Sequence, residues 1–404
     1  MAETPFAITR WTATTATAPV LYSPISGRPL TSPHLSKWFT SIRAAFASAR
    51  HMRLGDNKLV KCVAYSCTAF LAFRVSYRAL SFINVYFLHR GNINRYKHHS
   101  ESPGGVWAVV TNATNVIGLT MSLRLAEEGF NVLLQGDDLA GLRNGLNSLH
   151  ARCPSQSFKL ITTDPSGVTV VERLDFEHPP INGAWQTKQE SNTKTIDEEL
   201  LKMKITVLVN SVDIHLSGPC LDPQLLLEKS EPTLLEETGQ YTLLPIQMTR
   251  RFLPYLMNNR PALIMTLGLQ MGEDLPLLVS HSAGRSFQDS MTKSLSLEMK
   301  LGGLDIEVLC VKLSATYNDD GTVNISSLGP LPAAAIARVG CGECVTFGNW
   351  LDDLKKKVWG IMPRRLKEMH IIDEMRQKKD KVGKTRMRNH QQRAMMFEGA
   401  ADYR

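Results

Sequence analysis

Short apolar runs alternate with segments of helical spacing through the middle of this chain. Runs such as "VWAVVT" and "ALIMTLGL" are continuously apolar, which is typical of strands buried on both faces. Strands that alternate with amphipathic helices predict an α/β fold of the Rossmann type, with a doubly wound parallel sheet and helices on both faces. The predicted strands cover residues 106–111, 130–135, 168–176, 205–211, 262–269 and 304–313.

The helices between these strands have recognisable ends. The helix after the first strand should end at Gly129, because glycine adopts the left-handed conformation of a helix C-terminus. The stretch 234–257 predicts a longer helix, which Pro245 must kink or restart. The segment "SHSAGRSFQDSMTKSLSLEM", residues 280–299, predicts a helix between the last two strands.

A long apolar stretch, Cys62–Leu88, precedes the first strand and predicts an N-terminal membrane-anchor helix. Arg74 and Arg78 divide it into uncharged runs of 12 and 10 residues, each short of the roughly 20 residues of a clean span. The two arginines lie four residues apart and so share one helix face. A full crossing, an interfacial or tilted anchor and a buried soluble helix are all consistent with this pattern.

Composition divides the chain into four regions. Residues 1–58 are rich in Ser, Thr, Ala and Pro, which indicates a disordered leader and also resembles an organelle transit peptide. The other regions are a membrane anchor with its linker (59–100), a Rossmann domain (101–345), and an amphipathic and basic C-terminal extension (346–404) that predicts a helical tail.

Charge is distributed unevenly around a net value of +8. Residues 1–100 carry 13 Lys and Arg against 2 Asp and Glu, and residues 364–393 carry 11 against 4, whereas residues 101–363 carry 21 against 30. An acidic core argues against nucleic acid as a partner. Two basic flanks favour an anionic membrane surface, with solvated charged tails as the alternative.

Cysteine usage indicates neither a disulfide framework nor a metal centre. The seven cysteines form an odd set without framework spacing, which favours a reducing compartment. Cys341 and Cys344 form a lone Cys-x-x-Cys with no second ligand pair at a supporting spacing, so no metal is predicted.

The turn after the first strand is the expected place for a dinucleotide, because a helix N-terminus there faces the pyrophosphate. It reads "TNATNVIG" and keeps one glycine, Gly118. Asn112 is able to adopt a positive φ, whereas the β-branched Val116 projects toward the pyrophosphate position. Asp137 lies nineteen residues after Gly118, where a carboxylate binds a ribose hydroxyl and disfavours NADP. A helix-capping role for Asp137 is the alternative.

The order of these segments resembles the short-chain dehydrogenase/reductase superfamily, and within it the membrane-bound very-long-chain 3-oxoacyl-CoA reductases, relatives of the 17β-hydroxysteroid dehydrogenases. The resemblance runs from about residue 60 to about residue 390. The segments that carry it, in family order, are "LSFINVYFL", "GVWAVVTNATNVIG", "LAEEGFNVLL", "VLVNSVD", "PLLVSHSAGRSF" and "LKEMHIIDEMRQKK".

The resemblance implies a set of cofactor-binding positions and an NADP(H) cofactor. In the reductases an Arg near position 137 takes the NADPH phosphate; here Asp137 reverses the charge and favours NAD(H). The family's Asn-Asn-x-Gly motif reads Asn210, Ser211, Val212, Asp213, so only its first Asn survives. The positions carried over as cofactor-binding are Thr111, Asn112, Ile117, Gly118, Asp137, Asp175 and Asn210.

The resemblance also implies a catalytic Ser, Tyr and Lys, and this chain replaces all three. The Ser position falls at Gly268 or Leu269, which have no hydroxyl, and the structural Asn falls near Tyr241. His281 stands for the Tyr that donates a proton, and Arg285 for the Lys four residues on. Both face one side of a helix; a nearby Arg disfavours imidazolium, although His can donate a proton near neutral pH.

Two functions from different classes remain open on this sequence. The first is reduction of a very-long-chain 3-oxoacyl-CoA, or another lipid ketone, at the endoplasmic reticulum membrane, with the leader leaving a mitochondrial location open. The second is a catalytically silent binding or scaffold subunit, for which elongation-complex proteins or a homodimer would be partners. Val116, Gly268, His281 and Arg285 favour the second function; the intact strand order, Asp175, Asn210 and the lipid-facing anchor favour the first.

Overall fold

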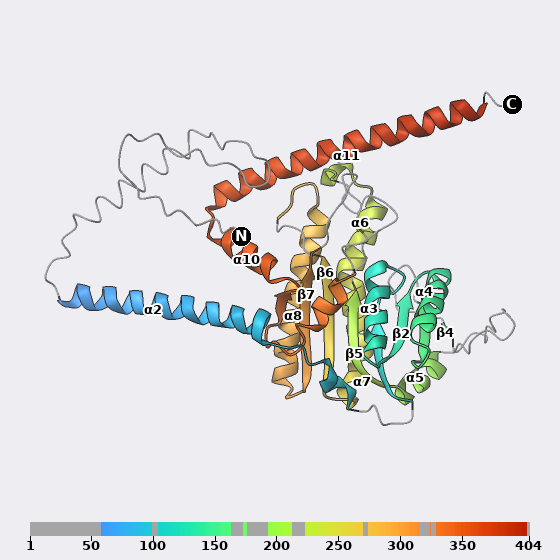
Figure 1. The fold of residues 1–404 in the computed structure, drawn as a ribbon, viewed down its shortest axis with the longest axis horizontal. Coiled ribbons are helices and arrows are strands. Elements are labelled where there is room, and N and C mark those ends of the chain that lie inside the picture. The colour runs from blue at the N-terminus through green and yellow to red at the C-terminus, as the bar shows by residue number, and fades with distance from the viewer. Residues whose placement is uncertain are drawn as a thin grey trace, which may run out of the picture. The chain divides into compact units, whose positions relative to one another are not determined.

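The structure is a computed structural model of the 404-residue chain (Figure 1). It describes residues 58–98, 104–162, 173–175, 193–211, 223–269, 274–314, 324 and 329–401. The chain divides into two compact units, Met1–Leu80 and Ser81–Arg404. The predicted leader, residues 1–58, lies almost entirely outside the described residues.

The described part of the first unit is most of helix α2, Lys58–Ile83, which continues into the π-helical turn η1, Asn84–Leu88. From Tyr65 to Leu80 its side chains are exposed, Phe73 at 68% and Tyr77 at 66%. Among the helices that the structure describes, none is long and apolar enough to cross a membrane.

The second unit is built on a twisted sheet with strand order β4-β3-β2-β1-β5-β6-β7-β8. Every neighbouring pair is parallel except β3 and β4. The order reverses direction between β1 and β5, which is the switch point where ligands bind in doubly wound sheets. The strands are β1 Val106–Val110, β2 Asn131–Gly136, β3 Phe158–Thr162, β4 Arg173–Asp175, β5 Lys204–Ser211, β6 Ala262–Leu269, β7 Ile306–Leu313 and β8 Val345–Phe347.

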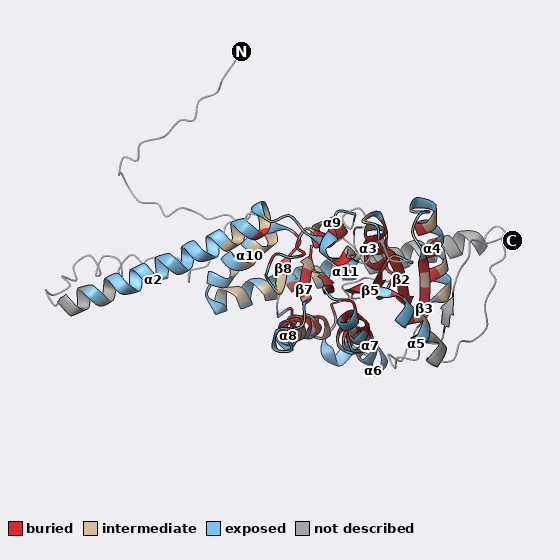
Figure 2. Ribbon diagram, turned by 90° about the horizontal axis from the view of Figure 1, so that it is seen from below, coloured by how far each residue is buried: buried red, intermediate tan, exposed pale blue. Residues whose placement is uncertain are grey.

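Helices cover both faces of this sheet (Figure 2). One hydrophobic cluster joins the sheet to α3, α4 and α9, and a second joins it to α5, α7 and α8. The fold is therefore the Rossmann-type doubly wound sheet that the alternating pattern predicts. The helices are α3 Val116–Glu127, α4 Leu139–Arg152, α5 Thr193–Lys202, α6 Glu231–Thr238, α7 Leu244–Asn258, α8 Val279–Leu301, α9 Leu331–Ile336, α10 Trp350–Ile361 and α11 Arg364–Ala401.

Short one-turn helices complete the described elements: η2 Ile93–Lys97, η4 Leu226–Glu228 and the π-helical η5 Gly239–Leu243. Gly129 follows α3 with φ 92°, as the sequence predicts for the end of that helix. The predicted helix 234–257 begins at Glu231, passes through η5 and restarts as α7, whose first turn contains Pro245.

The predicted third strand, 168–176, is only partly confirmed: residues 173–175 form a strand, and the rest of that segment lies outside the described residues. The third parallel strand is β3, and within the predicted segment the structure describes only the short antiparallel β4. The run "FKLIT" of β3 is only five residues long and contains Lys159, so it is a weaker apolar signal than the Val-rich segment that follows it. β8 was not predicted, because a three-residue edge strand has almost no periodicity.

Candidate functional site

The turn that follows β1 has one residue in the left-handed conformation and keeps one glycine of the family motif, Gly118. Asn112 has φ 48°, so an asparagine holds the left-handed position, as the sequence predicts. Its backbone N–H donates to Gln135 Oε1 at 3.1 Å. Thr111 is buried, and its Oγ1 accepts from the backbone N–H of Ser211 at 3.1 Å, which joins the ends of β1 and β5.

Gly118 is required where helix α3 meets this turn. A Cβ atom at Gly118 would lie 2.4 Å from the carbonyl oxygen of Asn112 and 2.9 Å from Cα of Ala113. Both atoms belong to the backbone, so no side-chain movement relieves the contact. Asn115 caps α3 by accepting from the Gly118 N–H at 2.7 Å.

The two apolar residues at the start of α3 pack in the same hydrophobic cluster but differ in burial. Ile117 is 4% exposed and belongs to the hydrophobic cluster under α3 and α4. Val116 is partly buried and packs against the same cluster. The family-like Ile117 is therefore a core residue that fixes the turn to the sheet.

Asp137 and Asp138 follow β2, and the structure separates their roles. Asp138 caps α4, with its carboxylate accepting from the N–H groups of Ala140 and Gly141 at 3.0 Å each. Asp137 is exposed. The capping alternative for Asp137 is thus wrong, because the neighbouring aspartate takes that role.

Asn210 and Asp175 lie on different strands. Asn210 is the residue before the last in β5 and is 1% exposed. Its Nδ2 donates to Thr249 Oγ1 on α7 at 3.0 Å. Asp175 is paired in register with Leu160 of β3, on the antiparallel edge of the sheet. Val212 and Asp213 lie outside the described residues.

Arg285 fills the space beside Gly268, near the end of β6. A Cβ atom at Gly268 would lie 2.6 Å from Arg285 Nη1, and this nitrogen also donates to Gln288 Oε1 at 3.3 Å. The position that resembles the family's Ser is therefore occupied by a guanidinium group. The two departures from the family pattern are neighbours in space, because a side chain at position 268 would collide with the guanidinium group of Arg285.

Tyr241 packs against both predicted catalytic residues. Its ring centroid lies 5.0 Å from that of His281, and the Arg285 guanidinium carbon lies 5.3 Å from the ring centroid, a cation–π geometry. Tyr241 is 5% exposed. A Cβ atom at Gly284 would lie 2.5 Å from Cβ of Tyr241, so the glycine permits this close approach of η5 to α8.

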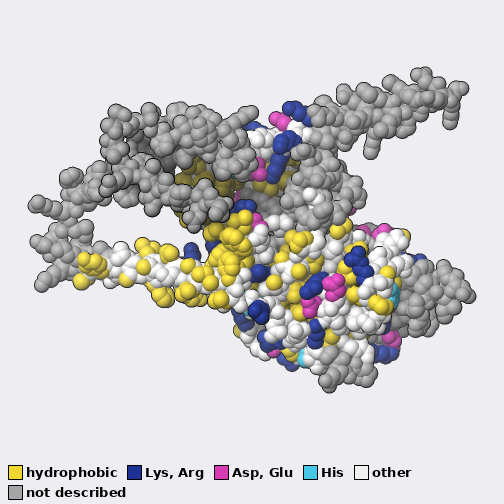
Figure 3. Space-filling model, viewed as in Figure 1, with side chains coloured by type: hydrophobic (Ala, Val, Ile, Leu, Met, Phe, Trp, Pro, Cys, Tyr) yellow, Lys and Arg dark blue, Asp and Glu magenta, His cyan; other side chains and the backbone are white. Residues whose placement is uncertain are grey.

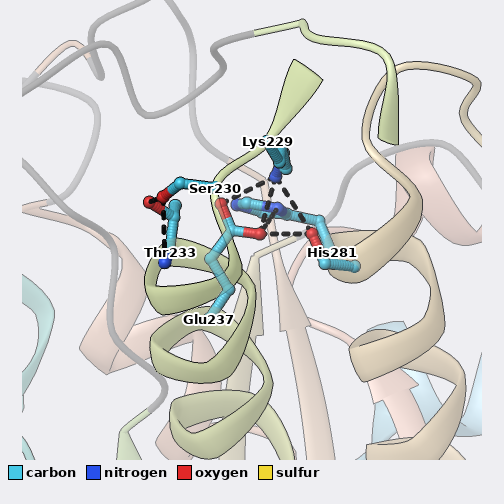
Figure 4. Close-up of polar contacts among 6 residues, drawn as sticks. Lys229, Ser230, Thr233, Glu237 and His281 are labelled. Atoms are coloured by element: carbon cyan, nitrogen blue, oxygen red, sulfur yellow. Dashed lines mark hydrogen bonds and ion pairs between the residues drawn. The ribbon is translucent and has the colours of Figure 1, made fainter. Parts of the chain in front are cut away.

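A buried ion pair lies beside His281 (Figure 4). Lys229 Nζ donates to both carboxylate oxygens of Glu237, at 2.7 and 2.6 Å, and the two side chains are only 5% and 12% exposed. Ser280 Oγ donates to the same carboxylate and accepts from Lys229 at 3.1 Å. His281 Nδ1 lies 3.9 Å from Glu237 Oε2.

The electrostatics of this cluster favour an ionised Glu237. Burial raises the pKa of the carboxyl, but hydrogen bonds from Lys229 and Ser280 and the charges of His281 and Lys229 outweigh it. The net pKa of Glu237 lies below its ordinary value of 4.5.

Sheet register brings most of the sequence-predicted positions to one edge. Val110 pairs with Val209, and Ser211 pairs with Leu267, so the ends of β1, β5 and β6 are neighbours. The turn 111–118, Asn210 and the pair His281 and Arg285 lie at or follow these ends, and Asp137 follows the adjacent β2. Asp175 is separate, two strands away from β2 in the sheet order.

Sequence reasoning missed Lys229, Glu237 and Ser280. Lys229 and Glu237 lie in a polar stretch that has no motif spacing, and Ser280 is one of several serines in α8. The one available signal was the proximity of Ser280 to His281 in the chain. Among the described residues, no group of three or more His, Cys, Asp and Glu side chains is placed to hold a metal ion.

Comparisons with known proteins agree with the resemblance. No protein-family model matches the chain. A very-long-chain 3-oxoacyl-CoA reductase of Aspergillus niger is 27% identical over 211 residues, covering 52% of this chain and 54% of the relative. The reductase of Pyricularia oryzae is 23% identical over 300 residues, covering 71% and 82%, and reductase A of Danio rerio is 26% identical over 241 residues, covering 59% and 66%.

The chain thus matches little more than half of the Aspergillus niger relative. A solved short-chain dehydrogenase of Sphingobium yanoikuyae, in complex with NADPH, aligns with a TM-score of 0.44 at 14% identity, covering 64% of this chain and 97% of its own. The curated relatives confirm that the chain resembles the short-chain dehydrogenase/reductase superfamily and, within it, very-long-chain 3-oxoacyl-CoA reductases.

Proposed function

We propose that this protein binds a nicotinamide dinucleotide and acts at a membrane as a binding subunit rather than as an efficient ketone reductase. One observation carries the proposal: the Arg285 guanidinium fills the space beside Gly268, and Tyr241 packs against Arg285 and His281. Protein side chains thus occupy the catalytic end, while the nucleotide turn keeps its backbone shape.

The residues of the nucleotide turn fit a dinucleotide. Asn112 supplies the left-handed position, and Gly118 allows the close contact of helix and turn. The N-terminus of α3 would face the pyrophosphate with its positive dipole end. Thr111, Ile117 and Asn210 hold the turn to the sheet, and a bound cofactor would supply or accept hydride.

Asp137 favours NAD(H) over NADP(H). It is exposed, and Asp138 performs the capping of α4, so Asp137 is available to a ribose 2′-hydroxyl. A carboxylate at this position would repel a 2′-phosphate. Asp175 is retained as a candidate adenine contact by resemblance.

The catalytic end lacks the groups that ketone reduction needs. Loss of a general acid typically lowers a rate by about 10²–10⁴-fold, and loss of an oxyanion donor by about 10²–10³-fold. These effects are not additive in one site, so the combined loss is smaller than their product. Arg285 retains a fork of donors that suits ribose hydroxyls but does not deprotonate.

Membrane association and partners are proposed from the relatives and from charge. The relatives' printed names concern 3-oxoacyl-CoA, so an acyl-CoA or another lipid ketone is the proposed ligand. The stretch Cys62–Leu88 and the basic flanks support an anchor at the endoplasmic reticulum membrane, with a mitochondrial location as the alternative. Proteins of an elongation assembly, or a second copy of the chain, are the proposed protein partners.

Cofactor titration and restoration test the proposal together. Saturation of the protein with NADH at about 100 times its Kd should stabilise the fold by roughly 2.7 kcal/mol, with a smaller effect of NADPH at equal concentration. A variant with Gly268→Ser, His281→Tyr, Arg285→Lys and Tyr241→Asn should gain oxidation of NADH by a 3-oxoacyl-CoA.

The matched control carries His281→Phe in place of His281→Tyr, because Phe has the same ring without the acidic hydroxyl. The proposal is supported if the fourfold variant with His281→Tyr gains turnover and the control with His281→Phe does not. No stabilisation by either nucleotide at millimolar concentration would contradict it.

A second candidate function is ketone reduction with His281 as the proton donor. The distance of 3.9 Å between His281 Nδ1 and Glu237 Oε2 favours it, because the carboxylate stabilises imidazolium. In that case a Glu237→Gln variant should move the pH profile of turnover to lower pH. Turnover of the wild-type protein that His281→Phe abolishes would favour this candidate over the first.

A further inference from the structure

Helix α10 presents an apolar side to solvent, and two acidic side chains are among those that it turns toward the domain. Asp352 and Asp353 have side chains only 14% and 15% exposed. Ser314 Oγ donates to Asp352 at 2.5 Å, and Asp353 faces the hydroxyl of Tyr86, whose pKa rises to about 12, mainly through burial. The usual arrangement of a surface helix is the reverse, with apolar residues inward.

The outward side forms a patch that we call the α10 patch. It consists of Trp350, Leu354, Val358 and Ile361, spaced four, four and three residues apart on one helix face, together with Phe87 of η1. Their exposed fractions run from 40% for Leu354 to 84% for Ile361. Phe87 joins the patch through its ring, whose centroid lies 5.9 Å from that of Trp350. Figure 3 shows hydrophobic side chains gathered over this part of the molecule.

Basic side chains border the patch. Lys355 is 69% exposed and lies between Leu354 and Val358 in the sequence. Arg364, with a side chain 91% exposed and paired with Glu368, and the exposed Arg365 begin helix α11, three and four residues after Ile361. A tryptophan at the edge of an apolar face with a basic border is typical of helices that lie in the plane of a membrane interface.

We infer that the α10 patch docks on a bilayer surface that contains anionic phospholipid. The helix has 12 residues, about 18 Å in length, so it suits the interface plane rather than a crossing. Buried apolar side chains and the attraction of Lys355, Arg364 and Arg365 to headgroups both favour this contact. The inference adds a second contact to the proposed membrane association through Cys62–Leu88, on which it rests in part.

Charge argues against two other occupants. A second copy related by two-fold symmetry would bring the basic border against itself. The segment 1–57 carries six Lys and Arg against two Asp and Glu, so it would also be repelled. An anionic lipid surface is complementary to both the apolar patch and its border.

The test is binding of the full chain to vesicles of phosphatidylcholine with phosphatidylserine. The variant Val358→Ser with Ile361→Ser should lower vesicle affinity about tenfold. Leu297→Ser with Leu301→Ser, on helix α8, is the matched control, because these two leucines are 65% and 89% exposed. All four substituted side chains are exposed, so neither variant should lose stability.

Each pair is measured in the wild-type chain and in a chain with Phe70→Asp and Phe73→Asp, which weakens the anchor. Lys355→Gln with Arg365→Gln should lower affinity about fivefold for each charge removed, and only for vesicles with phosphatidylserine. If the chain with the weakened anchor still binds vesicles, and adding the two α10 substitutions to it abolishes that binding, the inference is supported and the anchor is not needed.

Equal vesicle binding by the α10 pair and the α8 control pair in both backgrounds would overturn the inference, whatever the anchor variant does. Sedimentation of the same proteins without lipid measures their oligomeric state and gives a second way to contradict the inference. If the α10 pair converts a dimer to a monomer and leaves vesicle affinity unchanged, the patch is an interface between copies of this chain.

Discussion

The turn after β1, which we propose binds a nucleotide, and the start of α8, which resembles a catalytic site, depart from the family pattern in different ways. The turn after β1 has fewer glycines than the family motif, but Asn112 adopts φ 48° and Gly118 remains where backbone atoms meet. At the catalytic end the helix α8 also persists, but the chemical groups are replaced and Arg285 fills the space beside Gly268. A backbone shape tolerates substitution by another residue that adopts it, whereas proton donation requires a particular group.

The largest expected change in stability comes from the buried ion pair beside His281, which lies at the catalytic end and not at the nucleotide turn. Lys229→Met leaves Glu237 as an uncompensated buried charge and should lower the free energy of unfolding by about 3–5 kcal/mol. Lys229→Met with Glu237→Leu should recover most of this loss. Denaturant unfolding checks both. An equal loss in the single and double variants would show that packing, not charge, holds α6 to α8.

The same pair predicts a pH dependence. The folded pKa of Glu237 is depressed, so its contribution to stability is complete above the ordinary value of 4.5 and is lost as pH falls through the folded pKa. The stability difference between wild type and Lys229→Met should therefore shrink below about pH 4.5. Unfolding curves across that range measure the difference; a constant gap would contradict the assignment.

Gly118→Ala should damage the nucleotide turn. The new Cβ atom would meet the Asn112 carbonyl at 2.4 Å, which should lower stability by about 1–3 kcal/mol and nucleotide affinity with it. Gly360→Ala is the control, because its Cβ atom meets nothing within 4 Å and should stabilise α10 slightly. Calorimetry with NADH measures both variants. Unchanged affinity in Gly118→Ala would mean that the turn is not the nucleotide site.

The smallest effect concerns cofactor choice. Asp137→Arg should move the preference from NADH toward NADPH by about tenfold or more, because a charge-assisted hydrogen bond replaces a repulsion. Asp138→Asn removes a neighbouring charge but keeps a capping side chain, so it should leave the preference unchanged. Parallel titrations with both nucleotides give the ratio. No change in Asp137→Arg would exclude Asp137 from the ribose contact.

The fold followed from sequence where strands are buried on both faces, since their runs are continuously apolar. β3 was not predicted because it is short and contains Lys159, and β8 was not predicted because it has only three residues. In the site, the left-handed Asn112 was predictable, because asparagine is one of the few residues that adopt φ > 0.

Three features of the site depend on how side chains of separate turns and helices pack in space, and they were beyond prediction from one sequence. They are the space beside Gly268 filled by Arg285, the packing of Tyr241 on Gly284, and the pairing of Lys229 with Glu237. The assignment of helix capping to Asp138 rather than Asp137 also required backbone geometry.

We propose that the turn after β1 binds a nucleotide and that the replaced residues of α8 no longer support ketone reduction. One assay tests both parts most directly. Protein saturated with NADH, as shown by its fluorescence, is mixed with a long-chain 3-oxoacyl-CoA, and the absorbance of NADH is followed. We predict that NADH stays bound and is not oxidised over many minutes, while the variant that restores Ser, Tyr and Lys oxidises it. Rapid oxidation by the wild-type protein, or failure to bind NADH at all, would contradict the account.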